Sequence, residues 1–167
     1  MSVLDELVAG AVEDAKARES RISLERLKEL ASQAPAPIDA KRWLKRPDHI
    51  PVIAEIKRAS PSKGHLSDIP DPAALAREYE AGGASAISCL TEGRRFLGSL
   101  DDFDQVKAAV GIPVLRKDFI VNDYQIWEAR AHGADMVLLI VAALDDTRLG
   151  HLLDLAHELK MTVLVET

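Results

Sequence analysis

The sequence predicts an α/β protein built from repeated strand–helix units with parallel strands. Five short apolar segments, rich in β-branched residues, predict strands at residues 52–57, 86–90, 114–117, 136–141 and 163–166. They lack the polar alternation of a half-exposed sheet, so we expect parallel strands that are covered on both faces. The intervening segments carry apolar side chains at helical spacing. Such a repeat forms either an eight-stranded barrel or an open, doubly wound sheet.

The chain before the first strand predicts a helical extension that packs on the α/β unit. Leu4 and Leu7 belong to one apolar stripe, and Ser23 is a typical capping residue for a second helix. A proline-containing stretch ends that second helix. Both stripes are too small to form a core of their own. We therefore divide the chain into a helical extension, 1–46, and a partial barrel, 47–167.

Capping and helix-breaking residues delimit the helices that follow the strands. Asp71 and Pro72 are typical of a helix start, and the Gly82-Gly83 pair is typical of its end. Three further apolar stripes predict helices around residues 103–110, 124–131 and 149–159. Every predicted strand except the last is thus followed by a predicted helix.

The choice between barrel and open sheet depends on the first strand–helix loop. Gly64 stands alone there, without the glycine-rich pattern of a dinucleotide-binding sheet. The open fold is therefore disfavoured. Eight strands at this spacing need about 250 residues. We expect a barrel-type fold that is truncated after its fifth strand.

Composition and charge exclude several classes of protein. The 167 residues are 47% hydrophobic and 29% charged, which is ordinary for a globular protein with one core. The net charge of −6 argues against a nucleic-acid-binding surface. No apolar run approaches a membrane span, and the N-terminal segment is acidic and amphipathic, unlike a signal peptide. We expect a cytoplasmic protein without nucleic-acid or membrane partners.

The single cysteine and the scattered histidines argue against two further kinds of site. Cys89 lies inside an apolar run, so a disulfide scaffold and a cysteine-based zinc site are excluded. A buried side chain is the simplest interpretation of this cysteine. The histidines show no ligand-like clustering, and we expect no metal.

Charged side chains recur where the predicted strands end. Glu55 and Lys57 lie two residues apart and therefore leave their strand on the same face. Lys117 ends the third strand and Glu166 the fifth. In a parallel barrel these ends converge on one rim, where paired acid and base groups would serve proton transfer in both directions. The alternative interpretation is a set of structural ion pairs at strand ends.

The loop after the second strand, residues 91–99, carries an aromatic side chain between basic and small residues. Phe96 could cover an aromatic ligand, or it could pack on neighbouring loops. The sequence leaves both interpretations open.

Several motifs together resemble, in the right order, those of the indole-3-glycerol phosphate synthase family. The signature run is VIAEIKRASPS at residues 52–62, and VLRKDFI follows at residues 114–120. The resemblance also includes residues 90–99, 138–142 and 163–166, and it covers essentially the whole chain with its helical extension. It implies a TIM (βα)8-barrel, here truncated after the fifth strand.

The resemblance implies a carbon–carbon lyase of the carboxy-lyase type. It also implies a role in the biosynthesis of tryptophan, an aromatic amino acid. The family closes the indole ring of 1-(2-carboxyphenylamino)-1-deoxyribulose 5-phosphate with loss of carbon dioxide and water, and it needs no cofactor. Lys117 is implied as a general acid on the substrate carbonyl, and Glu166 as an aid to proton removal. Glu55 and Lys57 are implied to bind the anthranilate end and to help the dehydration.

The resemblance also implies that the substrate pocket is lined by Ser60, Pro61, Phe96 and Phe119. Family members continue through three more strands, whose loops help to bind the phosphate. The first and fifth predicted strands should therefore be open edges. Such edges allow three outcomes, which are self-association with another chain, closure of the two edges on each other, or exposure to solvent. The alternative function is a catalytically inactive fragment that serves folding or assembly. A sugar-phosphate isomerase of the same architecture is disfavoured by the signature run.

Overall fold

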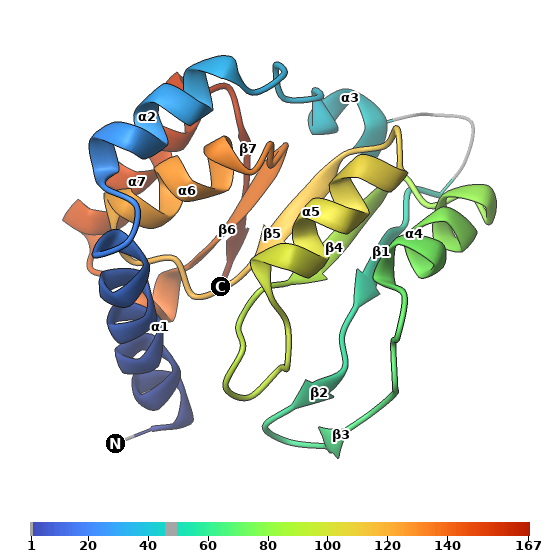
Figure 1. Cartoon of the computed structure of the whole chain (residues 1–167), viewed down its shortest axis with the longest axis horizontal. Coiled ribbons are helices and arrows are strands. Elements are labelled where there is room, and N and C mark those ends of the chain that lie inside the picture. The colour runs from blue at the N-terminus through green and yellow to red at the C-terminus, as the bar shows by residue number, and fades with distance from the viewer. Residues whose placement is uncertain (1, 46–49) are drawn as a thin grey trace.

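The computed structural model describes residues 2–45 and 50–167 (Figure 1). The boundary predicted between residues 46 and 47 lies outside the described residues, as does Arg46.

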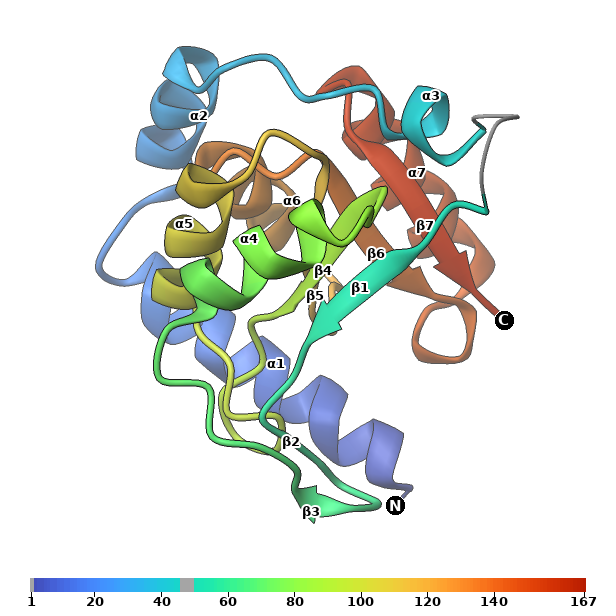
Figure 2. The ribbon, with the colours of Figure 1, turned by 90° about the vertical axis from the view of Figure 1, so that its right-hand side faces the viewer.

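Five parallel strands form one sheet and follow one another in the order in which they occur along the chain (Figures 1 and 2). A doubly wound sheet reverses its strand order at a switch point, whereas a (βα) barrel keeps the sequential order. The observed order therefore confirms the predicted barrel-type α/β class. The strands are β1 (Ile53–Ile56), β4 (Ala86–Leu90), β5 (Val114–Lys117), β6 (Met136–Ile140) and β7 (Thr162–Glu166).

The strand ends differ from the predicted ones by one residue at several places. β1 is one residue shorter at each end than predicted, and β7 begins one residue earlier. Val141 was predicted at the end of β6 but begins a short 3-10 helix, η1 (Val141–Ala143). The loop after β1 contains an unpredicted antiparallel pair, β2 (Ala59–Ser60) and β3 (Gly64–His65).

A helix follows each of the first four strands of the main sheet, as predicted. Each helix begins after a residue whose side chain accepts a hydrogen bond from a backbone N–H three positions on, which satisfies one free donor of the first turn. The predicted start at Asp71 and end at Gly82 are confirmed for the first of them. The helices are α4 (Pro72–Ala81), α5 (Leu100–Ala109), α6 (Asp123–Ala131) and α7 (Asp146–Glu158).

Successive side chains of each strand point to opposite faces of the sheet. The outer face packs against α4 to α7 and forms the larger core, which includes Ile87, Cys89 and Leu139. The inner face forms a smaller core around Leu115 and Met136. Burial raises the pKa of the Cys89 thiol to about 12, with a further contribution from the charge of Asp102. The prediction of a buried cysteine is confirmed.

The two edge strands correct the expectation that all five strands are covered on both faces. The three central strands are buried on both faces almost throughout, but Leu164 and Val165 of β7 are 37% and 43% exposed. Val52, directly before β1, is 49% exposed. The reason is that β1 and β7 each have one strand neighbour in the described part of the chain. They are the open edges that we expected, and they do not pair with each other (Figure 2).

Residues 2–45 form three helices, α1 (Val3–Glu19), α2 (Leu24–Gln33) and α3 (Ala40–Leu44). This segment packs on the α/β unit, as predicted. α2 lies against α6, and Arg130 of α6 donates to the carbonyl oxygens of Ala34 and Pro35 at 2.9 and 2.6 Å. Ala40 of α3 is fully buried in the inner core. α1 lies at the carboxyl ends of the strands, where it contacts η1 (Figures 1 and 2).

None of the helices in residues 2–45 and 50–167 combines the length and the apolar character needed to cross a membrane.

Candidate active site

The charged side chains predicted at the strand ends share the inner face of the sheet. Strand pairing sets their levels: Glu55 lies beside Ser88, Lys117 beside Leu90, and Glu166 beside Ile140. Because the strands are parallel, all of these positions lie near the same rim. The positions of these charged side chains at the rim are thus set by the alternation of side chains along the strands and not by the loops.

Glu55 holds two lysines together at this rim. Its Oε2 accepts hydrogen bonds from Lys117 Nζ at 3.2 Å and from Ser88 Oγ at 2.9 Å. Its Oε1 lies 3.3 Å from Lys57 Nζ. All three charged side chains are about one-third exposed, so the cluster is accessible from solvent. One carboxylate therefore positions two ammonium groups.

The environment of Glu55 favours its ionised form. Partial burial acts to raise the pKa of this carboxyl group, but the charge of Lys117 and hydrogen bonds from Ser88, Lys117 and Lys57 outweigh it. The net result is a pKa below the ordinary value of 4.5. Glu55 is consequently a carboxylate at neutral pH, suited to orienting cations.

A small cavity opens beside this cluster. Its volume is about 110 Å³, somewhat below the ~150 Å³ of an engineered protein cavity that holds benzene. Lys117 and Glu166 supply an ammonium and a carboxylate to a largely apolar lining. The lining residues are Leu90, Phe96, Lys117, Asp118, Phe119, Leu138, Ile140 and Glu166.

Phe96 and Phe119 form the aromatic part of the lining. Their ring centroids lie 6.1 Å apart with an angle of 42° between the planes, which is a favourable tilted arrangement. Phe96 therefore packs on a neighbouring loop and also faces the cavity. The packing interpretation of Phe96 is confirmed, and the contact of Phe96 with an aromatic ligand stays a prediction.

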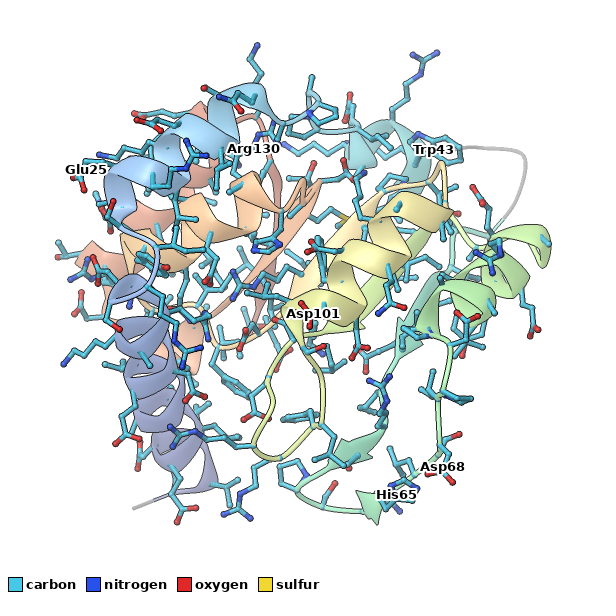
Figure 3. All side chains as sticks on the ribbon, in the orientation of Figure 1. Glu25, Trp43, His65, Asp68, Asp101 and Arg130 are labelled. Carbon is cyan, nitrogen blue, oxygen red and sulfur yellow. The ribbon has the colours of Figure 1, made fainter. Side chains whose placement is uncertain are left out.

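Two of the residues implied for the pocket do not line this cavity. Ser60 is buried at the base of the β2–β3 hairpin, where its Oγ accepts from the backbone N–H of Lys63 at 3.3 Å. Pro61 is exposed in the hairpin turn. His65 of the far hairpin strand lies 3.0 Å from Asp68, which follows the hairpin, and both side chains are exposed (Figure 3). The contact of Ser60 and Pro61 with the substrate stays a prediction.

Behind the rim lies a buried ionic network that the sequence did not reveal. Arg116 is completely buried, and its guanidinium lies 3.2 Å from Asp118 Oδ2 and 2.9 Å from Glu128 Oε2. Asp118 also accepts a hydrogen bond from Thr91 Oγ1 at 2.6 Å. Arg18 of α1 binds Glu128 from the other side at 2.6 Å. The network joins α1, α6 and the ends of β4 and β5.

Strand alternation offered a signal for part of this network. Because Lys117 lies on the inner face, strand alternation directs the neighbouring Arg116 to the helix side. The sequence analysis also missed Ser88, which donates a hydrogen bond to Glu55. The signal that could have found it is a polar residue within an apolar strand. The partners of Arg116 on α6 could not be read from the sequence, because no local pattern links them.

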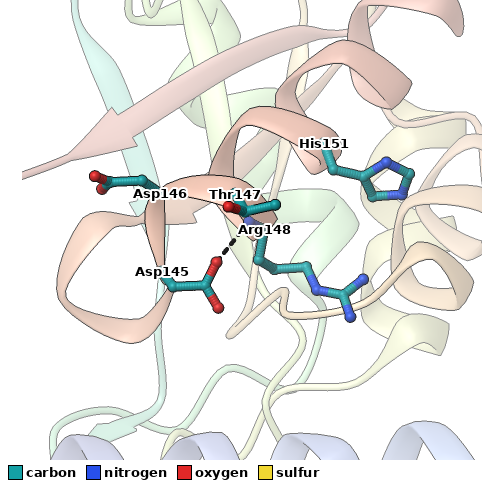
Figure 4. Close-up of a pocket in the computed structure, with 5 residues that line it drawn as sticks. All are labelled: Asp145, Asp146, Thr147, Arg148 and His151. Carbon is teal, nitrogen blue, oxygen red and sulfur yellow. Dashed lines mark hydrogen bonds between the residues drawn. The ribbon is translucent and has the colours of Figure 1, made fainter.

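A larger hollow, of about 780 Å³, lies at the start of α7 (Figure 4). Three of its polar side chains, Asp145, Arg148 and His151, already have partners within the fold. Asp145 accepts from the backbone N–H of Arg148 at 2.8 Å, and His151 Nε2 lies 2.8 Å from Asp123. It is an exposed surface around a capped helix end. The smaller cavity, with its converging acid and base groups, is therefore the better candidate.

Among the described residues, no three His, Cys, Asp or Glu side chains are grouped so that they could hold a metal ion.

Comparison with known proteins identifies the family of the chain. The family model described as indole-3-glycerol phosphate synthase matches residues 4–167. The chain is 61% identical over 165 residues to the indole-3-glycerol phosphate synthase of Mycolicibacterium vanbaalenii, covering 99% of this chain and 60% of that protein. Proteins of the same name from Beutenbergia cavernae and Micrococcus luteus are both 59% identical, over 166 and 170 residues.

These matches cover 99% of this chain in both cases, and 62% and 63% of the two relatives. The chain thus spans about three-fifths of the length of the curated relatives that it matches. The chain belongs to the indole-3-glycerol phosphate synthase family.

Proposed function

We propose that this chain carries the ring-closing site of an indole-3-glycerol phosphate synthase. The reaction converts 1-(2-carboxyphenylamino)-1-deoxyribulose 5-phosphate into indole-3-glycerol phosphate, carbon dioxide and water. The observation that carries the proposal is Lys117, which is bound to Glu55 and lines a small apolar cavity together with Glu166. Membership of the family indicates which reaction this arrangement of residues would serve.

The size and lining of the cavity favour the aromatic end of this substrate. A volume of about 110 Å³ suits a single ring after small side-chain movements, and it is too small for the sugar phosphate as well. Phe96, Phe119 and Leu138 supply apolar contacts. The cationic pair Lys57 and Lys117 lies at the mouth, where an anthranilate carboxylate would be attracted.

Ring closure needs an acid at the carbonyl oxygen. The ring carbon that bears the carboxylate attacks the carbonyl carbon, and the carbonyl oxygen takes a proton from the ammonium group of Lys117. The carboxylate then leaves as carbon dioxide, and its electron pair restores the aromatic ring. Glu55 supports this step by holding Lys117 at 3.2 Å.

Dehydration needs an acid and a base. The new hydroxyl group leaves as water after it takes a proton, while a base removes a proton from the ring carbon beside the nitrogen. We infer that Glu166 acts as the base and that the Glu55–Lys57 pair assists departure of the hydroxyl group. The complete reaction is redox-neutral and balances with acids and bases alone, so it requires no cofactor.

Product formation by the purified protein tests the proposal. The 167-residue chain is assayed alone and together with a polypeptide that corresponds to the part of the Micrococcus luteus relative that the chain does not match. Appearance of indole fluorescence, with none from the added polypeptide alone, is the expected result. A folded chain that forms no product under either condition would contradict the proposal.

The remaining expectations concern location and partners. With a net charge of −6, the chain is proposed to work in the cytoplasm on a small phosphorylated substrate, without nucleic-acid or membrane partners. Self-association through the open edges of β1 and β7 stays a prediction. Light scattering at several protein concentrations tests it, and a mass equal to one chain throughout would refute it.

A further inference from the structure

The loop between β4 and α5 is folded around one buried carboxylate. Glu92 is 6% exposed. Its Oε1 accepts from the backbone N–H of Arg94 at 2.9 Å, and its Oε2 accepts from those of Arg95 and Phe96, both at 2.8 Å. Three successive N–H groups thus converge on one side chain. The last of them belongs to the aromatic residue that faces the cavity.

Three further features show how tightly this loop is folded. The backbone N–H of Gly98 donates to the carbonyl oxygen of Glu92 at 2.9 Å, which closes the loop at its base. A Cβ atom at position 98 would collide with the carbonyl oxygen of Leu90. Leu97 has φ +57°, a left-handed conformation that persists only when the surroundings determine it.

The strained and buried parts of the loop lie on either side of Phe96. A loop that only connects a strand to a helix has no need to bury a carboxylate or to hold a leucine at positive φ, because both are unfavourable. The result of this arrangement is that Phe96 is fixed against Phe119, 6.1 Å away, as part of the cavity lining. Glu92 itself does not line that cavity.

The outer side of the same loop contacts α1 through exposed ion pairs. Arg94 binds Asp14 at 2.7 Å and Glu13 at 2.9 Å. These pairs are solvent-screened and therefore weak. The loop offers a matched comparison: a buried carboxylate that organises it from within, and an exposed carboxylate that contacts it from outside.

We propose that Glu92 is a positioning residue that fixes Phe96 as a wall for the aromatic group of the substrate. The carboxylate acts through the backbone N–H of Phe96 and does not touch the substrate. This inference rests on the proposed function where it concerns the substrate. Its structural part, that Glu92 orders residues 94–96, is independent of any reaction.

The test is Glu92→Gln, with Asp14→Asn as the matched control. Amide hydrogen exchange at residues 94–96 should quicken at least about tenfold in Glu92→Gln and stay unchanged in Asp14→Asn. The KM for the ring-closing substrate should rise about tenfold, as expected for loss of apolar contact in a pocket, while kcat changes less than about threefold. Calorimetric binding of anthranilate should weaken in parallel.

A double variant separates positioning from general stability. If Glu92 acts through Phe96, Glu92→Gln should raise KM no further in a Phe96→Ala background. Additive effects, or unchanged exchange in Glu92→Gln, would overturn the proposal. Glu92→Asp, which keeps the charge but shortens its reach, provides the same measurements if Glu92→Gln does not fold.

The two proposals fail in distinguishable ways. A wild-type protein without turnover would contradict the proposed function. Hydrogen exchange and anthranilate binding would still decide the role of Glu92. Unchanged exchange in a wild-type protein that does turn over would overturn the role of Glu92 alone.

Discussion

Removal of the Arg116 guanidinium should be among the most destabilising single changes in the protein. Arg116→Met keeps an unbranched chain of similar length but removes the cation that Asp118 and Glu128 share. Arg18 still partly compensates Glu128 at 2.6 Å, whereas Asp118 keeps only hydrogen-bond donors. Breaking a buried ion pair by removing one partner costs about 3–5 kcal/mol. At about 2–4 °C per kcal/mol for a chain of this size, Tm should fall by about 6–20 °C.

Thermal unfolding followed by circular dichroism measures this effect. Arg148→Met is the control, because Arg148 forms an exposed pair with Asp123 at 3.5 Å. Its loss should cost no more than about 0.5 kcal/mol. Arg116→Met combined with Glu128→Leu should recover part of the lost stability, since a buried charge is removed with its partner. An Arg116→Met protein with the Tm of the wild type would refute the role assigned to the network.

Three further outcomes follow from the site and its loops. Gly98→Ala should lower the free energy of unfolding by about 1–3 kcal/mol, because the new methyl group forces the loop away from Leu90. Urea titration measures this change. An unchanged urea midpoint would be incompatible with the close approach of position 98 to the carbonyl oxygen of Leu90. The ionised form of Glu55 stabilises the fold above its ordinary pKa of 4.5, and this stability is lost as the pH falls through the lowered pKa of the folded state. The Tm difference between wild type and Glu55→Gln should therefore shrink between pH 5 and pH 2, and a constant difference would contradict this. Glu55→Gln should also slow dehydration without abolishing anthranilate binding, as rapid-quench and calorimetric measurements would show. Normal turnover of this variant would contradict the role assigned to Glu55 in the reaction.

The parts of the fold that follow from local physical preferences were predictable. Apolar β-branched runs identified all five strands of the main sheet. The three central parallel strands are apolar because they are buried on both faces, and the edge strands β1 and β7 still contribute Ile56 and Val163 to the core. Asp71, Pro72 and the Gly82-Gly83 pair marked both ends of α4, because capping depends on a few adjacent residues. The β2–β3 hairpin was missed, because two-residue strands are too short to show a period.

The site was predictable only where it depends on strand alternation. Glu55 and Lys57 were correctly placed on one face of their strand, because side-chain direction follows from position in the strand. The partnership of Arg116 with Glu128 joins residues that only the packing of α6 on the sheet brings together. Glu92 gave no signal of its own, because a buried carboxylate that binds backbone N–H groups looks like any acidic loop residue in a sequence.

The turnover and the stability of Lys117→Ala, measured on the same protein, test the central claim most directly. A general acid contributes about 10²–10⁴ to the rate, and the Lys117 side chain is only partly buried. The account predicts a loss of at least about 100-fold in kcat, with a Tm within a few degrees of the wild type. Retained turnover, or a loss of activity that merely parallels a loss of folded protein, would contradict it.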